Sequence, residues 1–518
     1  MLRSHQIKIV LFLVVLIVTL SCRQTFQPMA IPTVVYNQST KAPAAGNAPQ
    51  ASRPAYMPVV RQLGDLSITT PTPDERRDLP EIRGETETYT VQTGDALGMI
   101  AARFGITLPM LLQANNITNP DHIEVGMELV IPAPIPGELG TGSKIIPDSE
   151  LVYGPLAQSF DVRGFVDQYG SYLGQYSEEV EGNLLTGPEI VKRVAWDYSV
   201  NPRLLLAVLE YQSGWVTMAN PPEESRVFPL GNWDGWHTGL YTQLAWAADM
   251  LNQGYYLWKV NGISGWLLAS GELIPVDASI NAGTAGVQQL FALLYGRAGW
   301  DKAVSSEGLF LTFSKLFGHP FDYAYEPLLP DGLEQPAMQL PFEPGVDWAF
   351  TGGPHGGWGS GSAWAALDFA PGINGIGCSL SDLWVVAVAD GQIIRADAGR
   401  VIQDLDGDGN EGTGWSVMYM HMEGRERVEE GTYLKAGEHI GHPSCEGGYS
   451  TGTHVHLARR YNGEWIPADQ VQAQNGLPFI LDGWASFGEG IEYYGYLERD
   501  GEAIEAWEGF FPGNTIHR

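Results

Sequence analysis

The stretch Ser450-Thr451-Gly452-Thr453-His454-Val455-His456-Leu457 places two imidazole side chains two residues apart. Its alternation of residue types predicts a strand over Thr453–Leu457, on which every second side chain faces the same way. His454 and His456 would then point to one side, where one can ligate a metal ion while its neighbour contacts metal-bound water. Two histidines at this spacing also fit a solvated strand face, so the surrounding sequence has to decide between the two readings.

The residues around this stretch predict a mainly antiparallel β domain over 343–475. Strand-like runs alternate there with glycine-rich turns, and Asp390-Gly391 favours a hairpin between the first two runs. The expected strands are Leu383–Val388, Gln392–Ala396, Trp415–Met420 and Thr453–Leu457.

The Ser-Thr-Gly-x-His-x-His pattern resembles the signature of the lysostaphin-like zinc endopeptidases, and the preceding Cys445-Glu446-Gly447-Gly448 resembles their β-lytic branch. Most members place the first two ligands as His-x-x-x-Asp, but Trp364 stands four residues before Asp368 and cannot bind zinc. The β-lytic branch spaces this pair farther apart, as Gly-Gly-x-His and Leu-Asp. That spacing matches Gly352-Gly353-Pro354-His355 followed by Leu367-Asp368.

This resemblance implies that Zn2+ is bound by His355, Asp368 and His456. Two imidazoles and one carboxylate leave the fourth tetrahedral position to water, as in catalytic zinc sites. A structural zinc site would more often be closed by four ligands, frequently thiolates.

Tyr419-Met420-His421 resembles the Tyr-x-His element of the same family, which implies a catalytic role for His421 together with His454. The two would orient the zinc-bound water, accept its proton and stabilise the oxyanion. A histidine packed in the core is the alternative for His421. His439 and His442 lie outside the matched positions, and we assign them no functional role.

Asp404-Leu405-Asp406-Gly407-Asp408 resembles the first half of a calcium loop, with oxygen donors at alternate positions. The acidic residue expected at the twelfth position is missing. The segment is therefore interpreted as an acidic hairpin tip, with a weak Ca2+ site at Asp404, Asp406 and Asp408 as the alternative.

Residues 87–133 resemble a LysM domain along its whole length, through Tyr-Thr-Val-Gln-Thr-Gly-Asp, Ala-Ala-Arg-Phe-Gly-Ile-Thr, Leu-Leu-Gln-Ala-Asn-Asn and Val-Gly-Met-Glu-Leu-Val-Ile-Pro. The resemblance implies a βααβ fold that binds N-acetylglucosamine polymers such as peptidoglycan or chitin.

Residues 149–328 show helical patterns over 187–210, 239–252 and 283–295, which predict an α-helical domain. The run from Tyr198 through Trp215 is similar to lysozyme-like transglycosylases. In that family a Glu directly precedes the Ser, but Gln212 stands there in this chain. An amide cannot protonate a glycosidic oxygen, so the domain is expected to be non-catalytic unless Glu210 substitutes.

The N-terminus predicts export. Residues 1–22 combine basic residues, the apolar run Ile9–Leu20 and Ser21-Cys22, which is the layout of a signal peptide. Thr19-Leu20-Ser21-Cys22 resembles a bacterial lipobox, which implies a lipid anchor at Cys22; an ordinary signal peptide is the alternative. Residues 23–86 are expected to be a disordered tether.

Two further cysteines, Cys378 and Cys445, lie in the predicted peptidase domain. An oxidising exterior would permit a disulfide between them, and a pair of buried thiols is the alternative. Residues 476–518 form a C-terminal extension in which Tyr-Gly-Tyr-Leu-Glu-Arg-Asp-Gly predicts a small hairpin.

Composition narrows the class of partner. The chain has 518 residues, with 29 Lys+Arg against 60 Asp+Glu and a formal net charge of −31. Such a surface repels phosphate backbones, so nucleic acid is excluded as a partner. The length exceeds what one core supports, in agreement with several domains.

These features predict an exported, cell-wall-associated zinc endopeptidase that cuts peptide cross-links of peptidoglycan while LysM holds the glycan. The alternative is a non-catalytic wall-binding lipoprotein that activates other wall hydrolases. Digestion of glycine-rich foreign protein or of prey walls is a third reading. The sequence leaves open the scissile bond and the oligomeric state.

Overall fold

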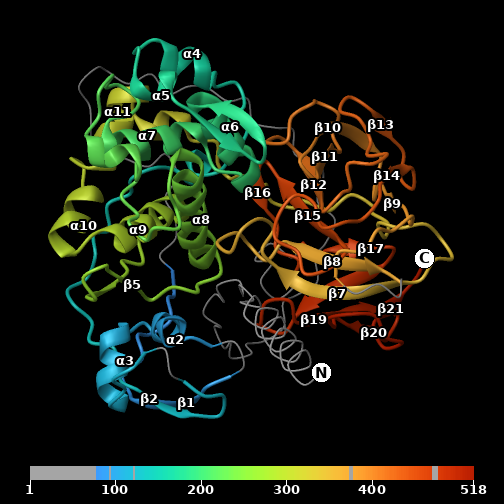
Figure 1. Cartoon of the computed structure of the whole chain (residues 1–518), viewed down its shortest axis with the longest axis horizontal. Helices are drawn as coiled ribbons and strands as arrows, with labels where there is room; N and C mark the ends of the chain where they lie inside the picture. The colour runs from blue at the N-terminus through green and yellow to red at the C-terminus, as the bar shows by residue number, and fades with distance from the viewer. Residues whose placement is uncertain (1–76, 93–94, 121–122, 373–376, 470–476) are drawn as a thin grey trace, which may run out of the picture.

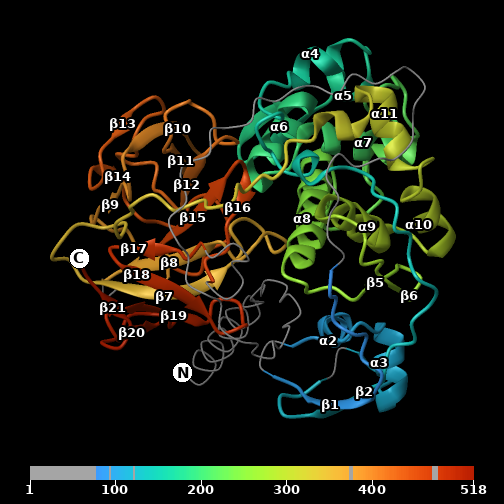
Figure 2. The same ribbon diagram turned by 180° about the vertical axis from the view of Figure 1, so that it is seen from behind.

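The computed structural model describes residues 77–518, apart from 93–94, 121–122, 373–376 and 470–476. The predicted signal over 1–22 and most of the predicted tether over 23–86 lie outside the described residues. Figure 1 shows a small βααβ unit, a helical domain and a β domain beside the helical one; Figure 2 shows the same arrangement from behind. Within the described ranges no single helix is long and apolar enough to cross a membrane. Only the bent pair of helices Leu97–Arg103 and Leu108–Asn115 passes the length and hydropathy test when taken together.

The first unit is the predicted βααβ fold. Strands β1 (Glu87–Thr90) and β2 (Glu128–Ile131) pair antiparallel, and α2 (Leu97–Arg103) and α3 (Leu108–Asn115) connect them. Asn115 at the end of α3 ties this helix to β2, because its side-chain amide bonds both the N–H and the carbonyl of Val130, at 2.6 and 2.7 Å. The predicted order of elements is confirmed.

The helical domain is built mainly from helices that share one core with the outer face of the β domain. Its elements are η1 (Asp148–Glu150), α4 (Val162–Asp167), α5 (Tyr172–Gln175), β3 (Ser177–Val180), β4 (Asn183–Thr186), α6 (Gly187–Tyr198), α7 (Pro202–Ser213), η2 (Glu223–Arg226), α8 (Leu240–Lys259), β5 (Gly265–Leu267), β6 (Leu273–Pro275), α9 (Ala282–Leu294), α10 (Arg297–Ala303), α11 (Leu309–Phe317) and η3 (Pro320–Tyr323).

The helical pattern expected over 187–210 is two helices rather than one. Ser199 adopts the left-handed conformation with φ 53°, which ends α6. Asn201 then caps α7 by accepting from the backbone N–H of Arg203 at 3.0 Å, and Pro202 occupies the first turn, where its missing N–H costs nothing. The apolar periodicity continues across this break and therefore did not reveal it.

The β domain is a nine-stranded antiparallel sheet with the order β13-β10-β11-β12-β15-β8-β7-β21, in which β16 also pairs with β15. Its strands, with the two-stranded pair β9 and β14, are β7 (Trp348–His355), β8 (Ala366–Pro371), β9 (Val385–Val386), β10 (Gly391–Asp397), β11 (Arg400–Asp404), β12 (Trp415–Met420), β13 (Tyr433–Leu434), β14 (His439–Gly441), β15 (Val455–Tyr461), β16 (Glu464–Trp465) and β21 (Thr515–Ile516).

Asp390-Gly391 does not form the predicted hairpin, because the strands on either side of it are not partners. β9 pairs with β14, whereas β10 pairs with β11 and β13. The Asp390 carboxylate instead accepts hydrogen bonds from Lys435 Nζ at 2.8 Å and from the Ala436 N–H at 2.9 Å. Asp390 thus holds the segment at Lys435 and Ala436 instead of forming a hairpin turn. The strand expected over 383–388 is only two residues long in the structure, Val385–Val386.

The C-terminal extension contains more structure than the predicted hairpin. Residues 480–505 form a four-stranded sheet of β17 (Ile480–Leu481), β18 (Trp484–Gly488), β19 (Gly495–Arg499) and β20 (Glu502–Glu505). The chain then returns as β21, which pairs with the outer edge of β7. The extension therefore lies against the strand that carries His355, as Figure 1 shows in red beside β7.

Buried charges join the helical domain to the β domain. Asp197 at the end of α6 accepts from Arg395 at 2.7 Å and from Arg400 at 3.0 Å, and it also pairs with Arg193 at 3.1 Å. Arg400 is fully buried. Burial raises the pKa of Asp197 to about 6, against the opposing effect of the arginines. Because buried charges are costly unless paired, this cluster makes the two domains depend on each other.

We predict that Asp197→Ala destabilises the fold by about 3–5 kcal/mol, because it leaves buried guanidinium groups without their carboxylate. Urea unfolding followed by circular dichroism measures the loss. The control is Asp301→Ala, which removes a half-exposed pair with Arg297 and should change stability by less than about 1 kcal/mol. Equal effects of the two variants would contradict the role given to the buried cluster.

Candidate metal centre

Three neighbouring strands carry the side chains that the sequence predicts as metal ligands. His355 ends β7, Asp368 lies in β8 and His456 lies in β15. The pairing of β15 with β8 puts His456 directly opposite Asp368. β7 and β8 pair with register shifts on both sides of Gly352. These shifts in β7 bring His355 close to Asp368 and His456. Residues 101 apart in sequence thus meet on one sheet.

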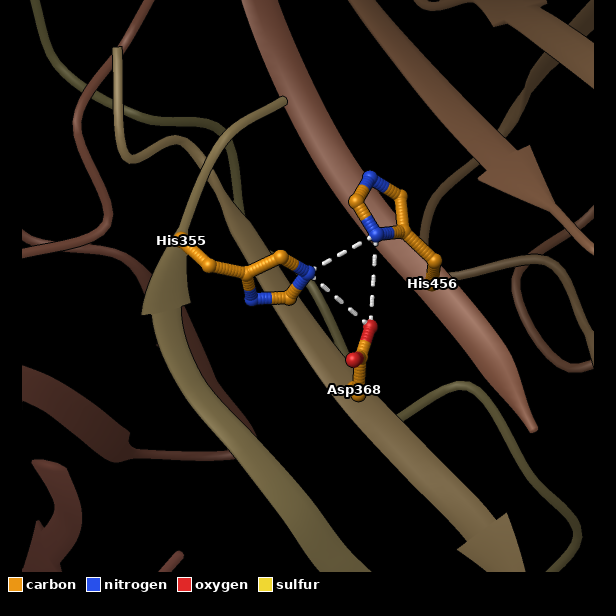
Figure 3. Close-up of side chains that lie close together, drawn as sticks. All are labelled: His355, Asp368 and His456. Atoms are coloured by element: carbon orange, nitrogen blue, oxygen red, sulfur yellow. Dashed lines mark hydrogen bonds and ion pairs between the residues drawn. The ribbon is translucent and has the colours of Figure 1, made fainter. Parts of the chain in front are cut away.

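The three side chains converge on one point (Figure 3). His355 Nε2 lies 2.9 Å from His456 Nδ1 and 3.3 Å from Asp368 Oδ1. His456 Nδ1 also lies 3.3 Å from Asp368 Oδ1. Tetrahedral ligands about 2.0–2.1 Å from a zinc ion are roughly 3.3 Å from one another, so the triangle has the size that zinc requires.

In each ligand imidazole, the nitrogen that faces away from the other ligands fixes the protonation of the nitrogen that faces them. His355 Nδ1 donates to the Gly353 carbonyl at 2.8 Å, and His456 Nε2 donates to the Gly357 carbonyl at 3.0 Å. A carbonyl accepts only from an N–H, so in the neutral rings His355 Nε2 and His456 Nδ1 both present lone pairs. Such outer contacts orient metal-binding histidines.

Asp368 completes a donor set suited to a cation. Its Oδ1 atom is buried and accepts no hydrogen bond from the described residues. Burial would raise the pKa of Asp368, but the imidazoles of His355 and His454 hold that pKa well below its usual range. An ionised oxygen and two imidazole nitrogens thus converge on one point, where a metal ion could bind all three. The residues present therefore fit Zn2+.

The two predicted catalytic histidines lie beside this triangle. Their ring centroids are 4.4 Å apart, and His454 Nε2 is 3.7 Å from Asp368 Oδ1. Each fixes its outer nitrogen on a carbonyl, His421 Nδ1 on Glu446 at 2.9 Å and His454 Nδ1 on Gly452 at 2.8 Å. Burial and the neighbouring imidazoles lower the pKa of His421 to about 3, which keeps the ring neutral. Both rings can therefore accept a proton at Nε2.

His421 occupies a strained position. Its φ of 64° lies in the left-handed region, which costs a non-glycine residue of order 1 kcal/mol or more. Tyr419, two residues earlier, is buried in the core, accepts from the Val388 N–H at 2.8 Å and donates to Gln403. In the Tyr-x-His element the tyrosine therefore anchors β12, and the turn that follows directs His421 toward the site.

A disulfide supports the loops around the histidines. Cys378 and Cys445 are joined, which decides between the two alternatives that the sequence left open. Cys445 directly precedes Glu446, whose carbonyl accepts from His421. Thr453, beside His454, donates from its N–H to Gly377 at 3.1 Å. The bond thus holds both loops that position the two catalytic candidates.

The helical domain holds the loop between the first two ligands. Ser360 Oγ donates to Asp249 of α8 at 2.6 Å, and the Gly361 N–H donates to the same carboxylate at 2.8 Å. A Cβ on Gly361 would lie 1.9 Å from the Asp249 carbonyl, so only glycine permits this approach. Tyr198 also packs edge-on against Trp358, with centroids 6.2 Å apart.

Tyr493 is a site residue that the sequence analysis missed. Its ring stacks on His355 with centroids 4.2 Å apart and 19° between the planes. Its backbone accepts from the Gly353 N–H at 2.8 Å and donates to the Pro354 carbonyl at 3.1 Å, while Glu492 Oε1 accepts from Gly356. The tyrosines of the extension were visible in the sequence, but their pattern indicated only a hairpin.

The other candidates are placed as follows. The ring of His439 stacks on Trp384, and the ring of His442 packs against it at a tilt of 37°, with centroids 4.1 and 4.0 Å away.

The acidic loop joins β11 to β12 as a hairpin connection. Asp404, Asp406 and Asp408 lie close enough together to hold a cation, but their oxygens already accept from backbone N–H groups of the turn. The calcium alternative stays a prediction.

The carboxylate and the amide considered for glycosidic chemistry are both engaged. Glu210 accepts from the N–H groups of Val216 and Thr217 at 3.1 and 3.0 Å, and from the Thr217 hydroxyl at 2.6 Å. Gln212 donates to the Leu230 carbonyl at 2.8 Å and accepts from the hydroxyl of Tyr295. Glu210 therefore holds the turn that follows α7.

Three family models match this chain. Residues 89–132 match the LysM domain, residues 144–329 match the LasA N-terminal domain, and residues 374–467 match peptidase family M23. The M23 range contains His421, His454 and His456, while His355 and Asp368 precede it. The LysM and M23 matches confirm the predicted LysM and lysostaphin-like resemblances, whereas the helical region matches the LasA N-terminal domain and its lysozyme-like resemblance stays a prediction.

Similar proteins include Protease LasA of Pseudomonas aeruginosa, 27% identical over 363 residues that cover 64% of this chain and 77% of LasA. N-acetylmuramoyl-L-alanine amidase XlyA of Bacillus subtilis is 44% identical over 55 residues, 11% of this chain and 18% of XlyA. Among solved structures, the M23 metalloprotease pseudoalterin from the deep sea is 24% identical and covers 36% of this chain and 99% of its own, with a TM-score of 0.28. The catalytic domain of lysostaphin from Staphylococcus simulans is 26% identical and covers 24% and 89%, with a TM-score of 0.18.

We predict that Asp249→Ala loosens the loop between His355 and Asp368, because it removes the acceptor for Ser360 and Gly361. Hydrogen exchange of residues 356–364 should become faster, whereas the amides of β15 should not change. Asp249→Asn keeps one acceptor oxygen and should restore most of the protection. The prediction is wrong if Asp249→Ala leaves exchange in this loop unchanged.

Tyr493→Ala should lower affinity for Zn2+ about 10-fold, because the ring that stacks on His355 orients the ligand. Competition with a chromogenic chelator measures this affinity. Tyr494→Ala is the matched control, since Tyr494 is the next residue and its side chain is 54% exposed. A loss of affinity in both variants would point to a general disturbance of the extension.

Proposed function

We propose that this chain, which carries a LysM domain at residues 89–132 and a peptidase family M23 domain at residues 374–467, is an exported zinc metalloendopeptidase that hydrolyses peptide bonds in peptidoglycan. The observation that carries the proposal is the convergence of His355, Asp368 and His456 on one point. Three ligands leave one coordination position for water or substrate, which distinguishes catalytic from structural zinc sites.

His355 Nε2, Asp368 Oδ1 and His456 Nδ1 would hold the metal ion. When bound, Zn2+ supplies a Lewis acid that polarises a peptide carbonyl and lowers the pKa of a coordinated water toward about 7. The Gly353 and Gly357 carbonyls keep both imidazoles in the tautomer that presents a lone pair inward. These contacts prepare the site before metal or substrate arrives.

His421 and His454 would move the proton. His454 Nε2 lies 3.7 Å from Asp368 Oδ1, and in both rings Nδ1 is engaged with a carbonyl, which leaves Nε2 as the acceptor. Burial keeps the His421 ring neutral, so its Nε2 lone pair can accept a hydrogen bond from the attacking water. Once protonated, either ring becomes a donor that stabilises the negative oxygen formed at the carbonyl.

Cell-wall attachment completes the proposal. LysM would bind the N-acetylglucosamine glycan, and attachment raises the local concentration of cross-links at the metal centre. The similarity to the N-acetylmuramoyl-L-alanine amidase XlyA agrees with a substrate in the bacterial wall, and the similarity to Protease LasA agrees with hydrolysis of peptide bonds. The disulfide between Cys378 and Cys445 supports an oxidising, extracytoplasmic location. A lipid anchor at Cys22 is part of this proposal, and mass spectrometry of the mature N-terminus tests it.

The helical domain is proposed to be lysozyme-like in origin but without glycosidase activity. The amide of Gln212 cannot protonate a glycosidic oxygen. Glu210 accepts hydrogen bonds from three donor groups in the segment after α7. No bond of the glycan strand itself should therefore be cut.

The function is tested by digestion of purified peptidoglycan with and without a zinc chelator. New amino termini should appear only without chelator, and readdition of Zn2+ should restore them.

The variant His456→Ala should bind less than one tenth of the zinc that the unchanged protein binds, and its activity should fall more than about 100-fold. The reason is that even the residues that hydrogen-bond to metal ligands contribute about 10–100-fold to metal affinity or activity. His439→Ala, which lies outside the centre, should retain both. Intact peptidoglycan in all arms, together with activation of a second hydrolase, would favour the regulatory alternative.

A further inference from the structure

A short loop of the helical domain exposes two tryptophans. Trp233 and Trp236 are 60% and 78% exposed, and both lie in the loop 231–238 between η2 and α8. Phe228 packs against Trp233 with ring centroids 4.7 Å apart and supports it from one side. Isolated exposed apolar residues are common, but two exposed indoles three residues apart on one short loop are a candidate binding surface.

The loop is held in one conformation by a buried side chain. Gln243 of α8 accepts from the Leu230 N–H at 3.1 Å and donates to the carbonyls of Asn232 and His237 at 2.7 and 2.6 Å. Gln243 is completely buried. The loop therefore has both ends fixed to α8, and its two indoles lose little conformational entropy when a ligand binds.

Asp234 fixes the tip of the loop. Its Oδ1 atom accepts from the N–H groups of Trp236 and His237 at 2.9 and 3.0 Å, and its Oδ2 atom contacts His237 Nδ1 at 2.5 Å. The backbone of Trp236 lies inside this turn and is held by it. The exposed indole of Trp236 is thus carried by a fixed backbone.

Polar groups flank the indoles. Gln212 Nε2, which donates to the Leu230 carbonyl at 2.8 Å, and Trp233 Nε1 both lie 4.0 Å from the position that a Cβ on Gly231 would take. The side chain of Asn232 lies 3.2 Å from Asp234 Oδ2. Flat aromatic faces next to amide and carboxylate groups suit a pyranose, which offers C–H faces and hydroxyl or acetamido groups. The net charge of −31 disfavours an anionic polymer.

One helix connects this loop to the metal centre. The ring of His237 packs near Trp246 of α8, with centroids 6.5 Å apart. Asp249, one turn further along α8, holds the loop between His355 and Asp368. Substrate bound at the loop would therefore lie on the part of α8 that borders the β domain.

We propose that the exposed indoles of Trp233 and Trp236 form a glycan-binding subsite on the helical domain. The ligand class is an uncharged strand of N-acetylated pyranoses, of the polymer whose peptides the metal centre cuts. The inference rests on the proposed function for the identity of that polymer. It adds a second glycan contact, independent of LysM, nearer to the reacting bond.

Fluorine NMR of the full chain with 5-fluorotryptophan tests the subsite. Residues 89–132 contain no tryptophan, so glycan binding by LysM adds no indole signal of its own. Trp233→Phe and Trp236→Phe assign the two resonances, and the N-acetylglucosamine tetramer is the probe. Both resonances should shift in a saturable manner, whereas that of Trp507, 56% exposed in the C-terminal extension, should not.

Trp236→Ala should weaken this binding about 3- to 10-fold, as expected for the loss of one aromatic contact. Trp507→Ala is the matched control and should leave it unchanged. The proposal is overturned if neither resonance shifts while the tetramer saturates LysM, or if an apolar peptide shifts them and the sugar does not. The measurement requires no hydrolysis, so a failure of the peptidase proposal would leave its outcome unaffected.

Discussion

The site depends on one electrostatic constraint, the convergence of an ionised carboxylate and two imidazole lone pairs in a buried place. Asp368 Oδ1 is buried and accepts no hydrogen bond from the described residues, and the carbonyls of Gly353 and Gly357 hold the adjacent imidazoles with their lone pairs inward. A buried unpaired acceptor costs about 1–3 kcal/mol, and a bound cation would satisfy Asp368 Oδ1. The sheet maintains the arrangement because the strands that carry these groups are hydrogen-bonded neighbours.

The surroundings of the centre come from parts of the chain that are far from it in sequence. Asp249 belongs to the helical domain and Tyr493 to the C-terminal extension, yet both act on the segment that contains His355. The buried cluster around Asp197 fixes the helical domain on the sheet. The precision of the ligand geometry is therefore a property of the whole described chain, since packed interiors transmit small displacements.

The sequence predicted those features in which residue type and spacing carry the chemistry. His454-Val455-His456 on one strand, the Gly-Gly-x-His segment and the order of the LysM elements are of this kind, and the structure brings all five site candidates together. Asp390-Gly391 was misleading because a turn signal does not say which strands pair. Tyr493 was missed because its role depends on a left-handed turn, φ 70°, and on the docking of the extension. Neither leaves a periodic pattern in the sequence.

The position of Trp233 and Trp236 bears on how a tethered enzyme selects a cross-link. A LysM domain alone could bind a glycan at any position along the strand and in either direction. A second glycan contact on the domain that is rigidly joined to the catalytic sheet would restrict these orientations. Effective concentration then rises only for peptides attached at the right distance from the bound sugars. Under this proposal the helical domain, without any acid of its own, contributes to specificity by fixing the direction in which the glycan runs past His355 and Asp368.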